Sequence, residues 1–212
     1  MERKLMNTKN VVLMGMFGAL AAVLMLFEVP LPFLAPSFYG LDFAEVPMLV
    51  GTFALGPVAG IVMQIVKILI KLILKPTSTG FVGEFANVVM SCALILPAGF
   101  IYRFKKSKTG AVAGMAVGTV LMAVVGVVMN ALVMIPFYSN FMPIETIIKA
   151  GAAVNPAVSS VWTLAIFCVG PFNLVKGTLT SVITAVIYKR ISVLIHGASH
   201  GTSGSYGVKK AV

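Results

Sequence analysis

Long apolar runs separated by short polar or proline-containing segments dominate the pattern along this chain. A helix that crosses a membrane needs about 20 mostly apolar residues, and the pattern predicts six such helices. They lie near residues 10–27, 43–60, 61–75, 84–102, 111–137 and 163–189. The second and third meet at Gly56-Pro-Val-Ala-Gly60 without a polar loop. We divide them there because Gly-Pro cannot continue a regular helix and the combined run is too long for one span.

The composition points to the same class of protein. Hydrophobic residues make up 59% of the 212 residues and charged residues only 10%, with a mean hydropathy of +1.03, unlike an average soluble domain. We predict an all-α integral membrane protein: a six-transmembrane-helix bundle over residues 1–192, followed by a flexible Gly- and Ser-rich cytoplasmic tail at 193–212. No small-residue cleavage site follows the first apolar run, so an uncleaved first helix is expected.

The basic residues predict the orientation of the bundle. Lys and Arg in short loops remain on the cytoplasmic side of a membrane. The basic groups lie before the first predicted helix, between the fourth and fifth, and after the sixth: Arg3, Lys4, Lys9, Arg103, Lys105, Lys106, Lys108, Lys189, Arg190, Lys209 and Lys210. Both termini are therefore expected in the cytoplasm. The net charge of +10 is mostly a topology signal, since charges scattered over loops do not form a nucleic-acid surface.

Amide and ionisable side chains interrupt the predicted helices at a few positions. An ammonium at membrane depth costs about 2.5–3.5 kcal/mol on insertion scales, so Lys176 is expected to face a cavity or a polar partner. The same reasoning applies to Glu84, Asn87, Lys67, Asn130 and Asn173. Glu84 and Asn87 are three residues apart, as are Asn173 and Lys176, so each pair shares a helix face. We predict that these side chains outline one polar pocket in the outer half of the membrane.

Structural roles for the same residues stay open at this point. Glu84 could be a first-turn acid that stabilises the helix dipole. The Asn amides could bond neighbouring helices together, at about 0.6 kcal/mol each. Lys67 could pair with Asp42, Glu45 or Glu84, and the sequence does not choose among them.

The polar side-chain types suggest the kind of ligand. Asn amides donate and accept hydrogen bonds in one plane, and Lys supplies a point donor. This set favours a ligand with polar edge atoms and a large flat apolar body. The proline-rich apolar loop at 28–42 is stiff; it either closes over such a ligand or packs on the ends of the bundle.

Small residues recur at every fourth position of the first helix, in Gly15-x-x-x-Ala19 and Gly18-x-x-x-Ala22. Such a strip lets another helix approach closely. The strip serves either packing inside the bundle or contact with an external partner on the cytoplasmic half.

Motifs for enzyme chemistry are missing from the sequence. A phosphate-binding loop needs Gly directly before its Lys, whereas Val175 precedes Lys176. No Cys pair has metal-ligand spacing, and both histidines lie in the tail. Cys92 and Cys168 are interpreted as separate packed thiols. We predict a protein that binds and moves a solute, with no catalytic residues, metal or cofactor.

Several motifs together resemble the substrate-binding S component of energy-coupling factor (ECF) transporters. They are the small-residue strip, Leu41-Asp-Phe-Ala-Glu-Val-Pro47, Gly56-Pro-Val-Ala-Gly60, Gly83-Glu-Phe-Ala-Asn87 and Phe172-Asn-Leu-Val-Lys176. The resemblance covers about residues 10–190 and is closest to the riboflavin-specific members of the group. It implies a multi-pass receptor in a prokaryotic cell membrane that captures riboflavin with high affinity. Its implied partners are a transmembrane coupling subunit and two ATPase subunits.

The resemblance also implies roles for particular residues. The implied substrate-binding residues are Glu84, Asn87, Asn130, Asn173 and Lys176, with Leu31, Phe33 and Tyr39 as contacts from a lid. The implied coupling-subunit contact is either Gly18 with Ala22 or Gly15 with Ala19. Riboflavin is the transported ligand in this interpretation. Two alternatives are another vitamin for the same module and a stand-alone secondary transporter, although no inverted repeat is visible.

Overall fold

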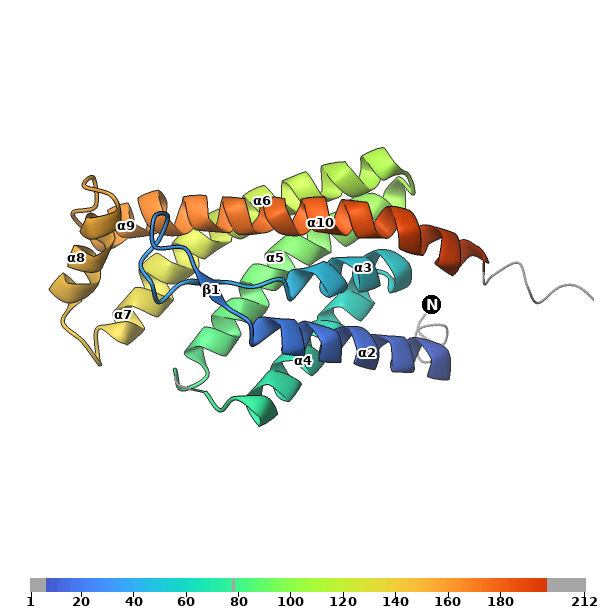
Figure 1. Cartoon of the computed structure of the whole chain (residues 1–212), viewed down its shortest axis with the longest axis horizontal. Coiled ribbons are helices and arrows are strands. Elements are labelled where there is room, and N and C mark those ends of the chain that lie inside the picture. The colour runs from blue at the N-terminus through green and yellow to red at the C-terminus, as the bar shows by residue number, and fades with distance from the viewer. Residues whose placement is uncertain (1–6, 78, 198–212) are drawn as a thin grey trace, which may run out of the picture.

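The computed structural model describes residues 7–77 and 79–197, with side chains described as far as Ile187, and it is mostly helical (Figure 1). The α-helices are α2 (Thr8–Met25), α3 (Glu45–Leu55), α4 (Pro57–Leu74), α5 (Val82–Phe104), α6 (Lys108–Met129), α7 (Ile135–Tyr138), α8 (Ile144–Val154), α9 (Val161–Leu164) and α10 (Gly170–Gly197). Two π-helical turns, η1 (Asn130–Met134) and η2 (Ala165–Val169), join α6 to α7 and α9 to α10. Two short antiparallel strands are β1 (Val29–Pro30) and β2 (Gly40–Leu41).

Five helical segments of the described chain are long and apolar enough to cross a membrane: Thr8–Met25, Pro57–Leu74, Val82–Phe104, Lys108–Tyr138 and Val161–Ile187. The prediction of a helical membrane protein is therefore confirmed. The remaining predicted span, 43–60, contains the apolar helix α3, which has only 11 residues. At 1.5 Å per residue, α3 covers about 16 Å, roughly half of the hydrocarbon core.

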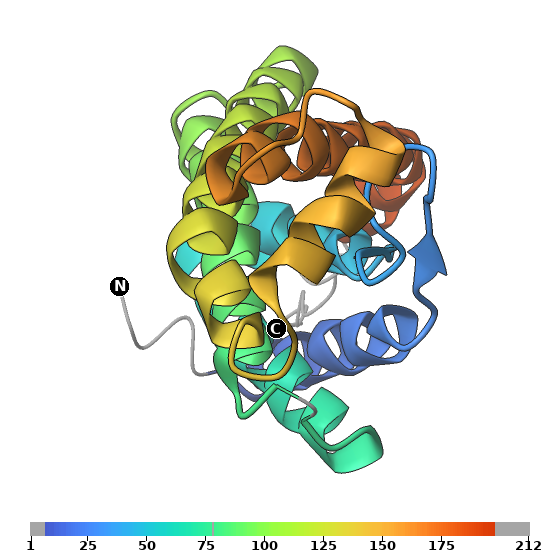
Figure 2. The same ribbon diagram turned by 90° about the vertical axis from the view of Figure 1, so that its left-hand side faces the viewer.

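The two ends of the bundle differ in character. The start of α2, the connection between α5 and α6, and the end of α10 lie together, to the right in Figure 1. The loop between α2 and α3, the connection between α4 and α5, and α8 lie toward the opposite end. Helix α8 runs across that end of the molecule (Figure 2). We call the end that carries α8 the loop end.

The break between α3 and α4 follows directly from the sequence. Gly56 has a φ of +98°, a conformation that favours glycine. Pro57 then begins α4, where its missing N–H has no intrahelical partner to lose. The predicted division is present, but α4 begins at Pro57 and not at residue 61.

Helix α8 is an element that the sequence pattern did not predict, because residues 138–162 lie between the fifth and sixth predicted spans. Its buried residues are Ile147 and Gly151. A Cβ on Gly151 would lie 2.8 Å from Leu164 Cδ1, so α8 packs closely on α9. Helix α8 packs Ile147, Ile148, Ala152 and Val154 on the core at this end of the molecule, but its 11 residues are too few for a membrane span, so a search for spans does not find it.

Two hydrophobic clusters organise the bundle. The first lies among the five helices from α2 through α6 and includes Met48, Leu49, Met63, Leu94 and Ile95. The second lies at the loop end and includes Leu41, Ile135, Ile147, Leu164 and Phe172. The second cluster places the loop between α2 and α3 against η2 and α10, which brings its polar residues over the bundle interior.

The C-terminal boundary differs from the prediction at 192. Helix α10 continues to Gly197, so residues 193–197 are helical. The rest of the predicted flexible tail, 198–212, lies outside the described residues.

Candidate binding cavity

A cavity of about 280 Å³ lies among the loop before α3 and helices α4, α5, α6 and α10. It brings together six of the predicted site residues: Tyr39, Glu84, Asn87, Asn130, Asn173 and Lys176. The other two predicted contacts do not line it. Leu31 packs against the loop-end cluster, and the Phe33 side chain is 76% exposed. The proline-rich loop therefore reaches the cavity through Glu28 at its start and through its second half, around Phe38 and Tyr39.

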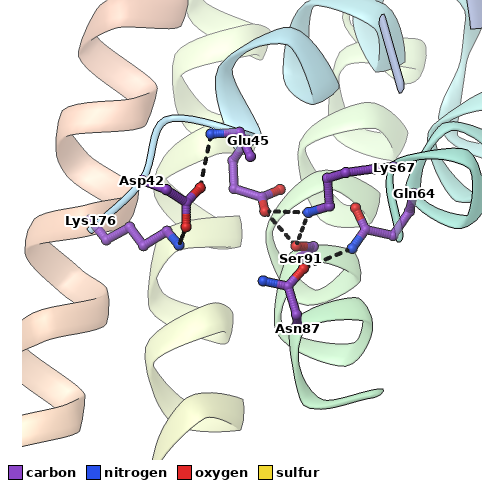
Figure 3. Close-up of polar contacts among 8 residues, drawn as sticks. Asp42, Glu45, Gln64, Lys67, Asn87, Ser91 and Lys176 are labelled. Carbon is purple, nitrogen blue, oxygen red and sulfur yellow. Dashed lines mark hydrogen bonds and ion pairs between the residues drawn. The ribbon is translucent and has the colours of Figure 1, made fainter. Parts of the chain in front are cut away.

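Asp42 and Lys176 form a buried ion pair at one wall of the cavity (Figure 3). Lys176 Nζ lies 2.6 Å from Asp42 Oδ2, while Asp42 Oδ1 accepts a hydrogen bond from the Ala44 N–H at 2.9 Å. Burial acts to raise the pKa of the Asp42 carboxyl, but the charge and hydrogen bond of Lys176, the charge of Lys67 and the Ala44 amide together lower it. The ion pair therefore fixes the end of the loop to α10.

Lys67 and Glu45 form a second buried ion pair, at 2.9 Å, which selects Glu45 from the three partners that the sequence allowed. Ser91 donates a hydrogen bond to the same carboxylate oxygen, Glu45 Oε1, and accepts one from Lys67 Nζ at 3.3 Å. Figure 3 shows these three side chains meeting from α3, α4 and α5. Glu45 and Ser91 line the cavity, whereas the fully buried Lys67 stands behind them.

Glu84 is held by several side chains at the loop end. Lys71 forms an ion pair with Glu84 Oε1. Thr77 and Thr79 donate hydrogen bonds to Glu84 Oε2, at 2.9 and 3.2 Å. Glu84 therefore organises the connection between α4 and α5 in addition to lining the cavity.

Asn130 links the loop to α6 and stands where the helix widens into η1. The Tyr39 hydroxyl donates to Asn130 Oδ1 at 2.8 Å, and Asn130 Nδ2 donates to the Gly126 carbonyl at 2.8 Å. Burial, followed by the neighbouring Tyr138 and Cys168, raises the pKa of Tyr39 above its ordinary value, so its hydroxyl remains a donor. The π-helical turns are common at functional sites, and apolar periodicity did not reveal either of them.

Asn87 and Asn173 present opposite groups to the cavity. Asn87 Oδ1 accepts a hydrogen bond from Gln64 Nε2 at 3.2 Å, which leaves the Asn87 N–H donors available. Asn173 Nδ2 donates to the Val169 carbonyl at 3.0 Å, which leaves the Asn173 oxygen as an acceptor. Gly126 makes room for Asn173, because a Cβ at position 126 would overlap Asn173 Nδ2. A ligand edge with both acceptor and donor atoms would match these two amides.

The cavity also contains residues that the sequence analysis did not assign to it. Its apolar and aromatic lining includes Met25, Phe38, Met90, Met122, Met134, Tyr138, Val169 and Phe172. The sequence indicated Asp42 and Glu45 as possible partners of Lys67 and as part of the motif Leu41–Pro47, but not as cavity residues. Asp42 precedes the buried helix α3, and Glu45 is its first residue. Because a buried acid needs a polar partner, these positions were the available signal for a polar site.

The charges in the lining are largely matched. Asp42, Glu45 and Glu84 each form an ion pair with a lysine. Polar groups occupy one part of the wall, and Met and aromatic side chains occupy the rest. This lining suits an uncharged ligand with polar edges and an apolar body. The described residues contain no group of three or more His, Cys, Asp and Glu side chains placed to hold a metal ion.

The small-residue strip of α2 divides into two faces. Gly18 is buried, and a Cβ there would lie 2.7 Å from Val66 Cγ1 on α4. Ala22 is fully buried, so this pair belongs to the interior packing of the bundle. Gly15 has open space where a Cβ would stand, and Ala19 is half-buried.

A helical membrane bundle with a polar cavity near one end is the architecture of a membrane-embedded solute-binding protein. Residues 9–188 match the family described as "ECF transporter, substrate-specific component". The chain belongs to this family. It is therefore a transporter component and not an enzyme, and a multi-pass protein of a prokaryotic cell membrane.

Known proteins similar to this chain include two named bacterial transporters. The "Riboflavin transporter RibU" of Staphylococcus aureus (strain TCH60) is 30% identical over 88% of this chain and 92% of its own length. The "Riboflavin transporter FmnP" of Bacillus subtilis (strain 168) is 28% identical over 88% of this chain and 93% of its own length. A solved structure described as "Structure and mechanism of the S component of a bacterial ECF transporter" superposes with a TM-score of 0.69 at 30% identity, covering 88% of this chain and 97% of that one.

Proposed function

We propose that this protein binds riboflavin as the substrate-binding subunit of an ATP-driven ECF importer. The observation that carries the proposal is the pair of oppositely oriented amides, Asn87 and Asn173, beside Lys176 in a cavity with Met and aromatic walls. The pyrimidine edge of a flavin alternates carbonyl acceptors with an N–H donor, and its fused rings are flat and apolar. The names of the two similar transporters support the same ligand.

In this proposal the flavin edge meets the amides of Asn87 and Asn173 and the ammonium of Lys176. Glu84 and Asn130 bind the remaining polar atoms directly or hold the segments that do so. Tyr39 closes the loop over the ligand through its bond to Asn130. Leu31 and Phe33 would serve as further lid contacts only if the first half of the loop moves toward the cavity.

The open face of α2 is the proposed contact with the coupling subunit. Gly15 and Ala19 form its small-residue surface, since Gly18 and Ala22 are already used against the bundle. A helix of the coupling subunit can approach this strip closely. Two ATPase subunits on the cytoplasmic side would supply the energy.

The proposed orientation places the loop end outside and both termini in the cytoplasm. Lys9, Arg103 and Lys108 support it, because they stand at or beyond the helix ends opposite α8. The short α3 and the non-helical segment before it would together complete a sixth crossing. Single cysteines at Ser107 and Asn140, in a chain without Cys92 and Cys168, test this orientation. A membrane-impermeant maleimide added to intact cells should label position 140 and not position 107; the reverse pattern would overturn it.

Riboflavin binding is tested on the purified protein in detergent. Titration should quench flavin fluorescence with saturation at one flavin per chain, and Asn173→Ala should weaken the affinity more than tenfold, about 1.4 kcal/mol. Absence of saturable flavin binding by the folded wild-type protein would overturn the proposal in favour of another vitamin.

The transporter class is tested in vesicles that contain this chain alone or with the coupling and ATPase subunits. Concentrative riboflavin uptake should require the complete complex and ATP. Uptake by the single chain under an ion gradient would instead identify a secondary transporter.

A further inference from the structure

Gln64 is a buried polar residue that lies outside the cavity lining and acts on the binding scheme only through its bond to Asn87. It stands on α4 with a fully buried side chain, and its Nε2 donates to Asn87 Oδ1 on α5 at 3.2 Å. Asn87 itself lines the cavity. Gln64 thus contacts a proposed ligand-binding residue from behind.

The bond from Gln64 determines which end of the Asn87 amide is available. An amide has an acceptor oxygen and two N–H donors, and the oxygen of Asn87 is engaged by Gln64. Within the described part of the chain, Asn87 Nδ2 has no hydrogen-bond partner. Figure 3 shows this nitrogen turned away from Gln64, toward the side on which Asp42 and Lys176 lie. The cavity wall at Asn87 is therefore a donor surface.

A free asparagine amide could rotate and offer its oxygen to the cavity instead. Rotation of Asn87 alone would bring Asn87 Nδ2 against Gln64 Nε2, so that two donors would face each other in a buried site. Such a mismatch leaves both groups without acceptors and is costly. The orientation of Asn87 is thus coupled to that of Gln64, which does not line the cavity and whose Oε1 is buried without a hydrogen-bond partner among the described residues.

We propose that Gln64 is a specificity-determining positioning residue: it holds the Asn87 amide with its N–H donors toward the ligand, so that the cavity selects a carbonyl or ring-nitrogen acceptor at this position. The inference rests on the proposed function and adds a residue and a polarity to it. Interhelical bonding alone would give Gln64 a purely structural role. If Gln64 is a positioning residue, its effect on binding requires Asn87. If its role is purely structural, its effect on binding does not depend on Asn87.

A double-mutant cycle separates them. Gln64→Met keeps the length of the side chain and removes its donor, and it should weaken riboflavin binding by about three- to tenfold. In an Asn87→Ala background, Gln64→Met should cause no further loss, because the group that it positions is absent. Met63→Leu, a buried volume-conserving change on the same helix, is the control and should leave the affinity unchanged. Equal losses from Gln64→Met in both backgrounds would overturn the proposal.

Gln64→Glu provides a second test if Gln64→Met does not fold. A carboxyl at this fully buried position stays protonated, because burial disfavours its charged form, and the neutral acid can still donate to Asn87 Oδ1. Riboflavin affinity should therefore remain clearly higher in Gln64→Glu than in Gln64→Leu, which has no donor, and equal affinities of these two variants would overturn the proposal. Absence of flavin binding by the wild-type protein would instead overturn the proposed function itself. The two failures are therefore distinguishable.

Discussion

Asp42 and Lys176 are 134 residues apart in the sequence, yet Lys176 Nζ lies 2.6 Å from Asp42 Oδ2. The pair joins the end of the loop between α2 and α3 to the sixth predicted span at a wall of the cavity. The lysine that first indicated a polar site is thus partly neutralised by the protein. Substitution of Lys176 therefore changes the ligand site and also leaves the buried Asp42 carboxylate without its partner.

Lys176→Ala should therefore lower thermal stability as well as riboflavin affinity. Removing one partner of a buried ion pair costs about 3–5 kcal/mol, because the other charge remains without compensation. The double variant Asp42→Asn with Lys176→Gln should recover much of the stability but not the affinity. Thermal unfolding in detergent and flavin titration measure the two effects. Full affinity in Lys176→Ala would remove this residue from the binding site.

Acid should destabilise the protein through Asp42. Its pKa is lowered from the ordinary 3.8, so the ionised carboxylate adds stability that is fully present above the unfolded-state pKa. That contribution is lost as the pH falls from about 4 through the folded-state pKa. Asp42→Asn should flatten the curve of melting temperature against pH in this acid range. If the acid side of this curve is the same in Asp42→Asn as in the wild type, the loss of stability in acid arises from other ionisable groups.

Gly126→Ala should weaken riboflavin binding more than tenfold, about 1.4 kcal/mol. The added methyl group would overlap Asn173 Nδ2 and displace an amide whose oxygen faces the cavity. Gly15→Ala is the matched control, since a Cβ at position 15 meets open space. Titration of both variants should show a loss only for Gly126→Ala. Equal affinities would mean that Asn173 tolerates displacement.

Tyr39→Phe should release the loop from α6. Removing its 2.8 Å bond to Asn130 costs about 0.5–1.5 kcal/mol, which corresponds to roughly three- to tenfold weaker binding. Most of the change should appear as faster flavin dissociation, measured by stopped-flow fluorescence. Because the pKa of Tyr39 is raised above 10.0, the wild-type dissociation rate should stay constant between about pH 7 and 9. A wild-type rate in Tyr39→Phe would show that the loop does not depend on this bond.

Gly15→Leu should preserve riboflavin binding and abolish ATP-dependent uptake in vesicles. A leucine there would occupy the proposed approach surface for a helix of the coupling subunit. Gly18→Leu should behave differently, because it would clash with Val66 and reduce the stability of the subunit itself. Normal uptake by Gly15→Leu would place the coupling contact elsewhere.

The segment 40–57 illustrates where the apolar pattern was insufficient. Hydropathy predicted a full span at 43–60, but the chain stays non-helical until Glu45 and turns at Gly56. The helix begins at Glu45, just after Asp42 has bound Lys176 and the Ala44 amide through its carboxylate, and it ends at Leu55, before Gly56. Hydropathy averages over a window and does not register such a long-range bond.

The polar set illustrates what could be inferred without coordinates and what could not. Burying an amide or a charge among apolar side chains is expensive wherever it occurs, so Asn130, Asn173 and Lys176 could be singled out from their positions within apolar runs. The partners of Lys176, Lys67 and Asn87 could not be inferred in this way, because Asp42, Glu45 and Gln64 come close to them only after the helices have packed.

The sequence by itself determined that this chain is a helical membrane protein with polar groups kept from lipid, because the length of an apolar run and the cost of a buried charge are local properties. Its motifs also sufficed to suggest the family. Only the tertiary structure decided that Lys67 pairs with Glu45, that Gly18 and Ala22 face inward, and that Asn87 and Asn173 offer opposite ends of their amides. Which ions pair, which helix faces point inward and how each amide is oriented all depend on which helices meet. The packing of the whole bundle determines that.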